Sequence, residues 1–130
     1  MQIKRKQKVT DRLELQDENG EIKVIIDVDI DVDRMMNDIN KSQNQIIRAQ
    51  MDLSKVKNEI TVQNYGTAIL EMINVIFGSE NAEKILNHYD NRYTEMLEDI
   101  MPYITEDIMP KIRRVADDRM KRMKEMHRRK

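Results

Sequence analysis

The stretch NGEIKVIIDVDIDV, residues 19–32, decides the fold of this chain. It opens with Asn19-Gly20, a dipeptide that favours tight hairpin turns because both of its positions tolerate positive φ. After the turn, every even position from 22 to 32 is Ile or Val. A period of two built from β-branched residues is typical of a strand with one buried face. The stretch therefore predicts a turn followed by a half-buried strand.

The residues before the turn supply a partner for this strand. Positions 9–16 alternate in part through Val9, Leu13 and Leu15, so we expect them to pair with residues 21–30. A hairpin of two strands is marginally stable in water, and its apolar face must therefore lie on helices. The side chains expected to be buried there are Ile22, Val24, Ile26 and Val28.

The odd positions of the second strand, from 27 to 33, are all Asp. A calcium-binding loop also has acids at alternate positions, but it needs Gly at its sixth place and Glu at its twelfth. Counted from the first Asp, those places hold Val32 and Asp38. We therefore expect a solvated strand face, with Asp31 or Asp33 capping the next helix.

Residues 33–63 contain neither Gly nor Pro, and apolar or small side chains recur there at spacings of four and three. This heptad pattern predicts one long helix that packs on a single partner helix. Its seam consists of Met35, Ile39, Ser42, Ile46, Ala49, Leu53, Val56 and Ile60. Because propensity alone leaves a helix marginal, we predict that self-association or a client covers at least part of residues 35–60.

A helical core is predicted over residues 67–112. Asn64 to Thr67 interrupt the seam, and residues 68–77 are apolar nearly all round, as in a buried helix. Gly78 suits the end of that helix and Ser79 the start of the next. Spacings of three and four then continue the apolar stripe to Ile100.

An internal repeat follows, because EDIMPYIT at 98–105 and EDIMPKIR at 106–113 share six of eight positions. Each copy carries a proline, Pro102 or Pro110, which lacks an amide donor and disfavours α geometry in the residue before it. We expect two kinks or short breaks that turn the chain before its last helix.

Both ends of the chain are basic, although the net charge is only −1. The formal charges are +4 for residues 1–8, −7 for 9–33, −5 for 34–110 and +7 for 111–130. This distribution predicts a basic arm over 1–8 and a basic helix or tail over 113–130, loose beyond Met123. Met120 and Met123 belong to its thin apolar stripe. Because Met adapts to irregular surfaces, both are candidate contact residues, although Met also serves as a gap-filler in cores.

The composition argues against an enzyme. The chain has no Cys, three isolated Gly, and two His, His88 and His127, without a second ligand at zinc spacing. Its many acids spread over helical surfaces and define no acid–base pair. We therefore expect no catalytic, cofactor-binding or metal-binding residues. No apolar run is long enough to span a membrane.

Several short motifs within residues 68–113 resemble the tail assembly chaperones of long, non-contractile-tailed phages and prophages of Gram-positive bacteria. They are ILEMINVIFG at 69–78, EKIL at 83–86, Tyr89, YTEM at 93–96 and MPYI at 101–104. The resemblance covers a little over a third of the chain and contains no catalytic signature.

This resemblance implies a non-enzymatic helical protein in the cytoplasm of a bacterial host. It would bind the tape measure protein and recruit tail-tube subunits during tail assembly. Family members often exist in a short form and a frameshift-extended form, and this chain would be the short one. The strongly basic tail has no counterpart in the family pattern.

Two other functions remain open. The seam over 35–60 could belong to a structural coiled coil that self-associates, or the basic ends could bind nucleic acid. Against nucleic acid, the tails contain no aromatic residue for base stacking, and residues 9–110 carry a net charge of −12. The sequence thus predicts one mainly α domain (α+β) over residues 1–130. In it, an N-terminal β-hairpin packs on a helical bundle with one long heptad-patterned helix, and the protein forms a homo-oligomer.

Overall fold

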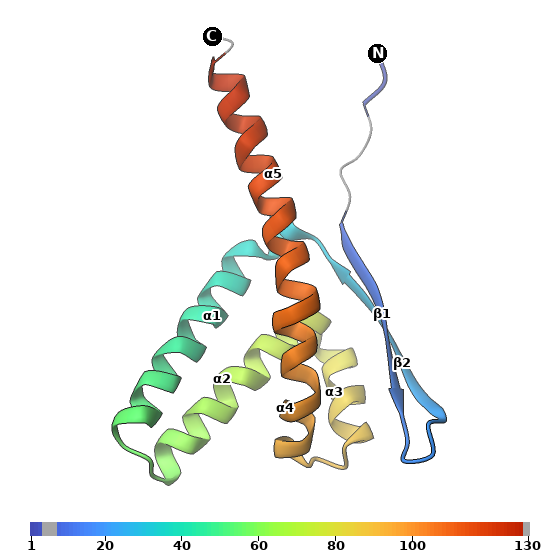
Figure 1. Ribbon diagram of the computed structural model, residues 1–130, viewed down its shortest axis with the longest axis vertical. Coiled ribbons are helices and arrows are strands. Elements are labelled where there is room, and N and C mark those ends of the chain that lie inside the picture. The colour runs from blue at the N-terminus through green and yellow to red at the C-terminus, as the bar shows by residue number, and fades with distance from the viewer. Residues whose placement is uncertain (4–7, 129–130) are drawn as a thin grey trace.

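The computed structural model describes residues 1–3 and 8–128 and confirms a mainly helical fold with an N-terminal hairpin (Figure 1). The elements in chain order are β1 (Val9–Gln16), β2 (Ile22–Ile30), α1 (Val32–Lys55), α2 (Glu59–Phe77), α3 (Ser79–His88), α4 (Tyr93–Pro102), the π-helix η1 (Tyr103–Ile108) and α5 (Met109–Arg128).

The predicted hairpin is confirmed. β1 and β2 pair antiparallel, with Val9 opposite Ile30. In the turn, the Asp17 carboxylate accepts hydrogen bonds from the backbone N–H groups of Asn19 and Glu21, at 2.9 and 3.0 Å. Gly20 adopts a φ of 80°, which a residue without Cβ takes at no steric cost. Because β1 ends at Gln16 and β2 begins at Ile22, the loop is longer than the Asn-Gly pair alone.

The expected burial of the even-numbered side chains holds only away from the turn. Ile26 and Val28 are buried and Val24 is half-buried, but Ile22 is 45% exposed, so the prediction for Ile22 is wrong. The pairing becomes irregular after Leu15, opposite this end of β2.

The single long helix predicted over 33–63 is also wrong. α1 begins behind Asp31, whose carboxylate accepts the backbone N–H of Arg34 at 3.4 Å as predicted, but it ends at Lys55. Asn58 and Thr61 then start α2 with a capping box, in which each side chain accepts the other's backbone N–H at 2.9 Å. These bonds satisfy amides at the new helix start and favour a break there.

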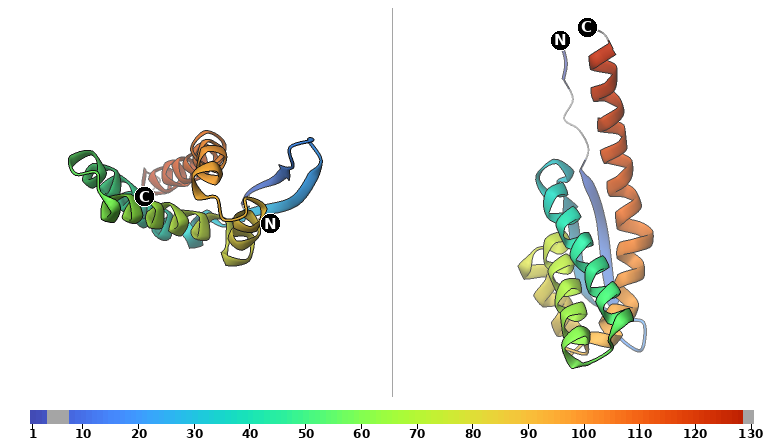
Figure 2. Two further views of the ribbon diagram at one scale, coloured as in Figure 1. Left: turned by 90° about the horizontal axis from the view of Figure 1, so that it is seen from below. Right: turned by 90° about the vertical axis from the view of Figure 1, so that its left-hand side faces the viewer.

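The break expected at 64–67 does not occur, because α2 runs through Gly66. Since the chain reverses between α1 and α2, the two helices pack along each other (Figures 1 and 2). The first half of the seam, with Ile39 and Ile46 buried, is thereby covered by the chain's own helices. Val56 and Ile60 lie at the connection and are exposed.

Isoleucine supplies half of the buried apolar residues and nearly all of the largest fully buried side chains. These largest side chains come from both layers of the fold, the hairpin and the helices. They are Ile26, Ile30, Ile39, Ile69, Ile73, Ile76, Ile85, Met96, Ile100, Ile104, Ile108 and Ile112.

The turn expected at the two prolines is absent, because α4, η1 and α5 follow one another without a break (Figure 1). The backbone widens instead, and the N–H of Met109 donates to the carbonyl of Ile104, five residues back. The Thr105 hydroxyl donates to the carbonyl of Met101 at 3.0 Å. A π segment next to Pro110, which has no N–H to offer, thus absorbs the irregularity without bending the helix away.

The last helix continues to Arg128, beyond the predicted loosening at Met123. Val115 and Ala116 pack on the core, and the Arg119 guanidinium pairs with the Asp33 carboxylate at the start of α1. Beyond Arg119, residues 120–128 are exposed and project from the body of the molecule (Figures 1 and 2). We call these residues the α5 tip.

Candidate functional site

The structure does not bring the eight predicted contact residues together. Ile39 and Ile46 are buried by their own chain, and Met35 and Leu53 are half-buried on α1. The four exposed residues form two separate groups. Val56 and Ile60 lie at the α1–α2 connection, whereas Met120 and Met123 lie on the α5 tip at the other end of the molecule.

Apart from these two groups, the protein has an apolar groove of about 200 Å³. It lies between α1, α2 and the continuous helix formed by α4, η1 and α5. We call it the methionine groove, since three of its lining residues are Met. It is lined by Gln43, Ile46, Ile47, Gln50, Met72, Met101, Ile104, Thr105 and Met109. Ile47 is 54% exposed at its edge, and Met51 follows it one turn later on α1, also exposed.

Local sequence explains how the groove forms. In the pair Ile46-Ile47, successive residues of a helix point about 100° apart, so Ile46 enters the core while Ile47 faces outward. On the opposite side, the π register of η1 shifts Met109 relative to Met101. The heptad pattern does not indicate this surface, because only Ile46 of the Ile46-Ile47 pair belongs to it. The spacing of four between Ile47 and Met51 was the signal that could have revealed it.

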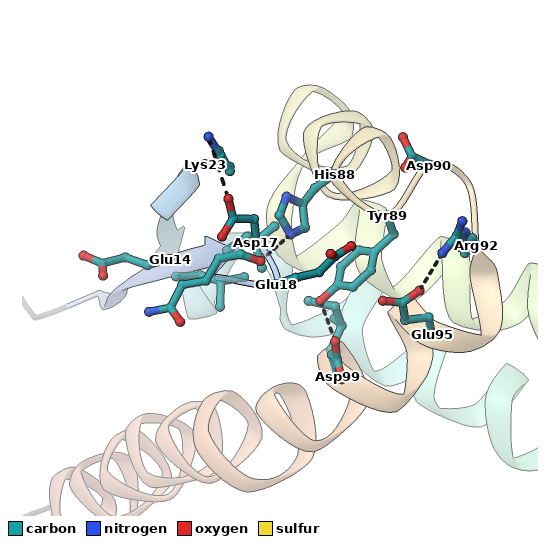
Figure 3. Close-up of a pocket in the computed structure, with 14 residues that line it drawn as sticks. Glu14, Asp17, Glu18, Lys23, His88, Tyr89, Asp90, Arg92, Glu95 and Asp99 are labelled. Carbon is teal, nitrogen blue, oxygen red and sulfur yellow. Dashed lines mark hydrogen bonds and ion pairs between the residues drawn. The ribbon is translucent and has the colours of Figure 1, made fainter. Parts of the chain in front are cut away.

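A cavity of about 670 Å³ lies between the turn end of the hairpin and the α3–α4 connection (Figure 3). Leu13, Leu15 and Ile100 contribute apolar atoms to its lining. Six carboxylates and two bases also line this cavity, so we call it the acidic cleft. The carboxylates are those of Glu14, Asp17, Glu18, Asp90, Glu95 and Asp99, and the bases are Lys23 and Arg92.

Hydrogen bonds fix the shape of the acidic cleft. The Tyr89 hydroxyl donates to Asp99 Oδ2 at 3.0 Å, and burial of this hydroxyl raises the pKa of Tyr89. His88 Nε2 lies 3.1 Å from the carbonyl oxygen of Gln16. This contact joins α3 to β1, although the two residues are 72 positions apart in the sequence. The backbone N–H of Glu21 lowers the pKa of Asp17, which keeps that carboxylate ionised.

The bases in the cleft are engaged locally and do not neutralise it. Lys23 Nζ lies 3.8 Å from an Asp17 oxygen, and an Arg92 nitrogen lies 3.8 Å from a Glu95 oxygen (Figure 3). Six carboxylates against two bases leave a negative field, which attracts cationic groups. Within residues 1–3 and 8–128, no three His, Cys, Asp or Glu side chains are grouped so as to hold a metal ion.

The α5 tip has the opposite character. Met120, Met123 and Met126 are all more than 60% exposed, and their spacing of three places them along one side of the helix. By the same geometry, Arg122 and Lys124 flank this methionine stripe on either side. The tip therefore presents an apolar stripe bordered by positive charge.

No helix in the described part of the chain is both long and apolar enough to cross a membrane. Comparisons with protein-family models, with curated proteins and with solved structures found no match for this chain.

Proposed function

We propose that this protein is a non-enzymatic phage tail assembly chaperone in the bacterial host cytoplasm. It binds the tape measure protein as a long helical client and recruits tail-tube subunits. Two observations support this proposal. One is the resemblance of residues 68–113 to that family, and the other is the methionine groove on the surface of α1 and η1.

The methionine groove is the observation that carries the proposal. Amphipathic helices bind proteins by laying their apolar face in such grooves. Met101, which is half-buried, supplies a flexible, polarizable side chain that can adapt to successive segments of a client, whereas Met72 and Met109 are buried among the lining residues. A chaperone of a long helical protein must accept many related segments, so an adaptable lining fits this role better than a rigid one.

The test first looks for a gene beside that of this chain that encodes a very long helical protein, and that protein is then expressed as overlapping fragments. Ile47→Asp places a charge on the exposed edge of the groove, and Met51→Asp places one on the exposed residue that follows it one turn later on α1. We expect each to weaken fragment binding at least about tenfold, since an unpaired charge is costly to bury. Gln45→Asp is the matched control. It adds the same charge to α1, but two residues before Ile47 and therefore rotated by about 200° around the helix.

Binding measured by calorimetry should be lost in both groove variants and retained in the control. The proposal fails if no fragment binds the unmodified protein, or if Ile47→Asp and Gln45→Asp bind equally well. Recruitment is tested by adding the tail-tube subunit to the purified complex, where a ternary complex is expected on a sizing column.

A further inference from the structure

The α5 tip is a helical segment that no other element among residues 1–3 and 8–128 buries. Its nine residues extend the helix by about 13 Å at 1.5 Å per residue, and all of them are exposed. Short helices without packing are marginal in water. An exposed methionine stripe on such a segment favours a partner that buries it. The four bases and one acid of residues 120–128 favour a partner that is negatively charged.

The acidic cleft has the matching character on the same chain. Its lining combines the half-buried Leu13 and the buried Leu15 and Ile100 with six carboxylates. Its volume of about 670 Å³ lies within the range of cavities that hold ligands. Apolar surface bordered by negative charge is complementary to methionines bordered by Arg122 and Lys124.

The two surfaces lie at opposite ends of the molecule. The hairpin turn and the α3–α4 connection, which form the cleft, are at one end, and the end of α5 is at the other (Figure 1). Because α5 is continuous with the packed helix from Tyr93 onward, its tip is held away from the cleft of its own chain. Only a second copy can bring the tip and the cleft together.

We propose that this protein assembles head to tail, with the α5 tip of one copy seated in the acidic cleft of the next. The methionine stripe covers the apolar lining of the cleft, while Arg122 and Lys124 face its carboxylates. This contact joins two different surfaces, so each added copy leaves a free tip and a free cleft, and the assembly grows as an open chain. It requires no client and does not depend on the proposed function.

Two charge-reversal variants test the contact from both sides. The tip variant carries Arg122→Glu and Lys124→Glu, and the cleft variant carries Glu18→Lys and Glu95→Lys, one substitution in each wall. All four positions are exposed, so the far-ultraviolet circular dichroism of each variant should match that of the unmodified protein. Sedimentation velocity is measured over a range of concentrations in low salt and in 500 mM salt.

The unmodified protein should show an average mass that rises with concentration beyond a dimer and falls in high salt, which screens exposed charges. Each variant alone should associate at least about tenfold more weakly, because like charges then oppose each other. The variant with all four substitutions restores opposite charges with unchanged net charge, and it should associate again. Lys41→Glu with Arg48→Glu, on the outer face of α1, is the control and should associate normally.

The proposal is overturned if the unmodified protein stays monomeric at millimolar concentration, if it stops at a closed dimer, or if the fourfold variant fails to recover. Binding of the monomeric protein to DNA or RNA in low salt would instead assign the basic tip to nucleic acid. Carbodiimide cross-linking gives an independent measurement on the unmodified protein. Intermolecular links from Lys121 or Lys124 to Glu18 or Glu95 are expected, and their absence from a cross-linked oligomer contradicts the contact.

Discussion

One hydrogen bond connects parts of the chain that lie far apart in sequence. The Tyr103 hydroxyl on η1 donates to Asp11 Oδ2 on β1 at 2.6 Å, and Lys111 Nζ lies 4.0 Å from the same oxygen. The ring of Tyr103 stacks on Phe77 with centroids 6.3 Å apart. The hydrogen bond lowers the pKa of Asp11, while burial raises that of Tyr103. The Tyr103–Asp11 hydrogen bond thus holds the hairpin against the π-helix.

Tyr103→Phe keeps the ring and removes the hydroxyl. We expect the free energy of unfolding to fall by about 1.5–2 kcal/mol, the lower part of the range for a hydrogen bond to a charged group, since Asp11 is partly exposed. Tyr93→Phe is the control, because Tyr93 is half exposed at the start of α4. Urea titrations measure both variants, and equal losses would show that the hydroxyl of Tyr103 contributes nothing particular.

The lowered pKa of Asp11 also predicts a pH dependence. The folded state binds a proton at Asp11 less readily than the unfolded state, so the stabilisation is complete above the unfolded pKa of about 4. It is lost as the pH falls through the lower folded pKa. In Asp11→Asn, stability should therefore fall less steeply between about pH 4 and pH 2. Parallel urea midpoints for the variant and the unmodified protein across that range would contradict this.

Among the elements, the junction of α2 and α3 depends on a single glycine. Gly78 has φ 82° and ψ 157°, a conformation that residues with a Cβ rarely adopt. Gly66, in contrast, lies within α2, and a Cβ added there would meet nothing within 4 Å. The same substitution should thus have opposite effects at the two positions.

We expect Gly78→Ala to lower the free energy of unfolding by about 1–3 kcal/mol through backbone strain. Gly66→Ala should raise it by about 0.5–1 kcal/mol, because alanine stabilises a helix interior relative to glycine. Thermal and urea unfolding measure both variants. A destabilised Gly66→Ala would mean that α2 is not continuous through this position.

Sequence predicted the elements where one short-range pattern dominates. The period of two before and after Asn19-Gly20 specified the hairpin, since the pattern depends on neighbours. The break between α1 and α2 was missed because the heptad spacing continues through Val56 and Ile60, while the capping box of Asn58 and Thr61 involves polar residues that hydropathy ignores. Both prolines were interpreted too strongly, because a π register can accommodate a missing donor.

The binding surfaces were harder to predict than the elements. The methionine groove joins Ile47 to Met101, and the acidic cleft joins Asp17 to Glu95. These pairs come from elements that meet only after packing, so no local spacing in the sequence relates them. The partition of charge along the chain predicted a basic C-terminal helix, which the structure shows up to Arg128, whereas most of the basic arm predicted over 1–8 lies outside the described residues. It did not predict that the fold would place the acidic cleft at one end of the molecule and the basic tip of α5 at the other end.

For the whole molecule, protection from hydrogen exchange should follow the division between body and tip. Backbone amides of residues 120–128 should exchange faster than those of residues 109–116 in the same helix, because the tip has no tertiary cover. If copies dock through the tip, its exchange should slow as the protein concentration rises. If exchange at the tip stays fast at every concentration, the tip frays and does not bind a second copy.

The hairpin is synthesised before the helices that cover it, because β1 and β2 precede all of them in the chain. Its contacts include α2, α3 and α5, and the Tyr103 bond and Lys111 reach it from near the C-terminal end. At about 5–20 residues per second, the roughly 80 residues between β2 and Ile112 take several seconds to synthesise. During that time both strands are unprotected edges with an uncovered isoleucine and valine face. The aspartates on the opposite face at positions 27 and 29 would then oppose pairing between nascent chains on one messenger RNA.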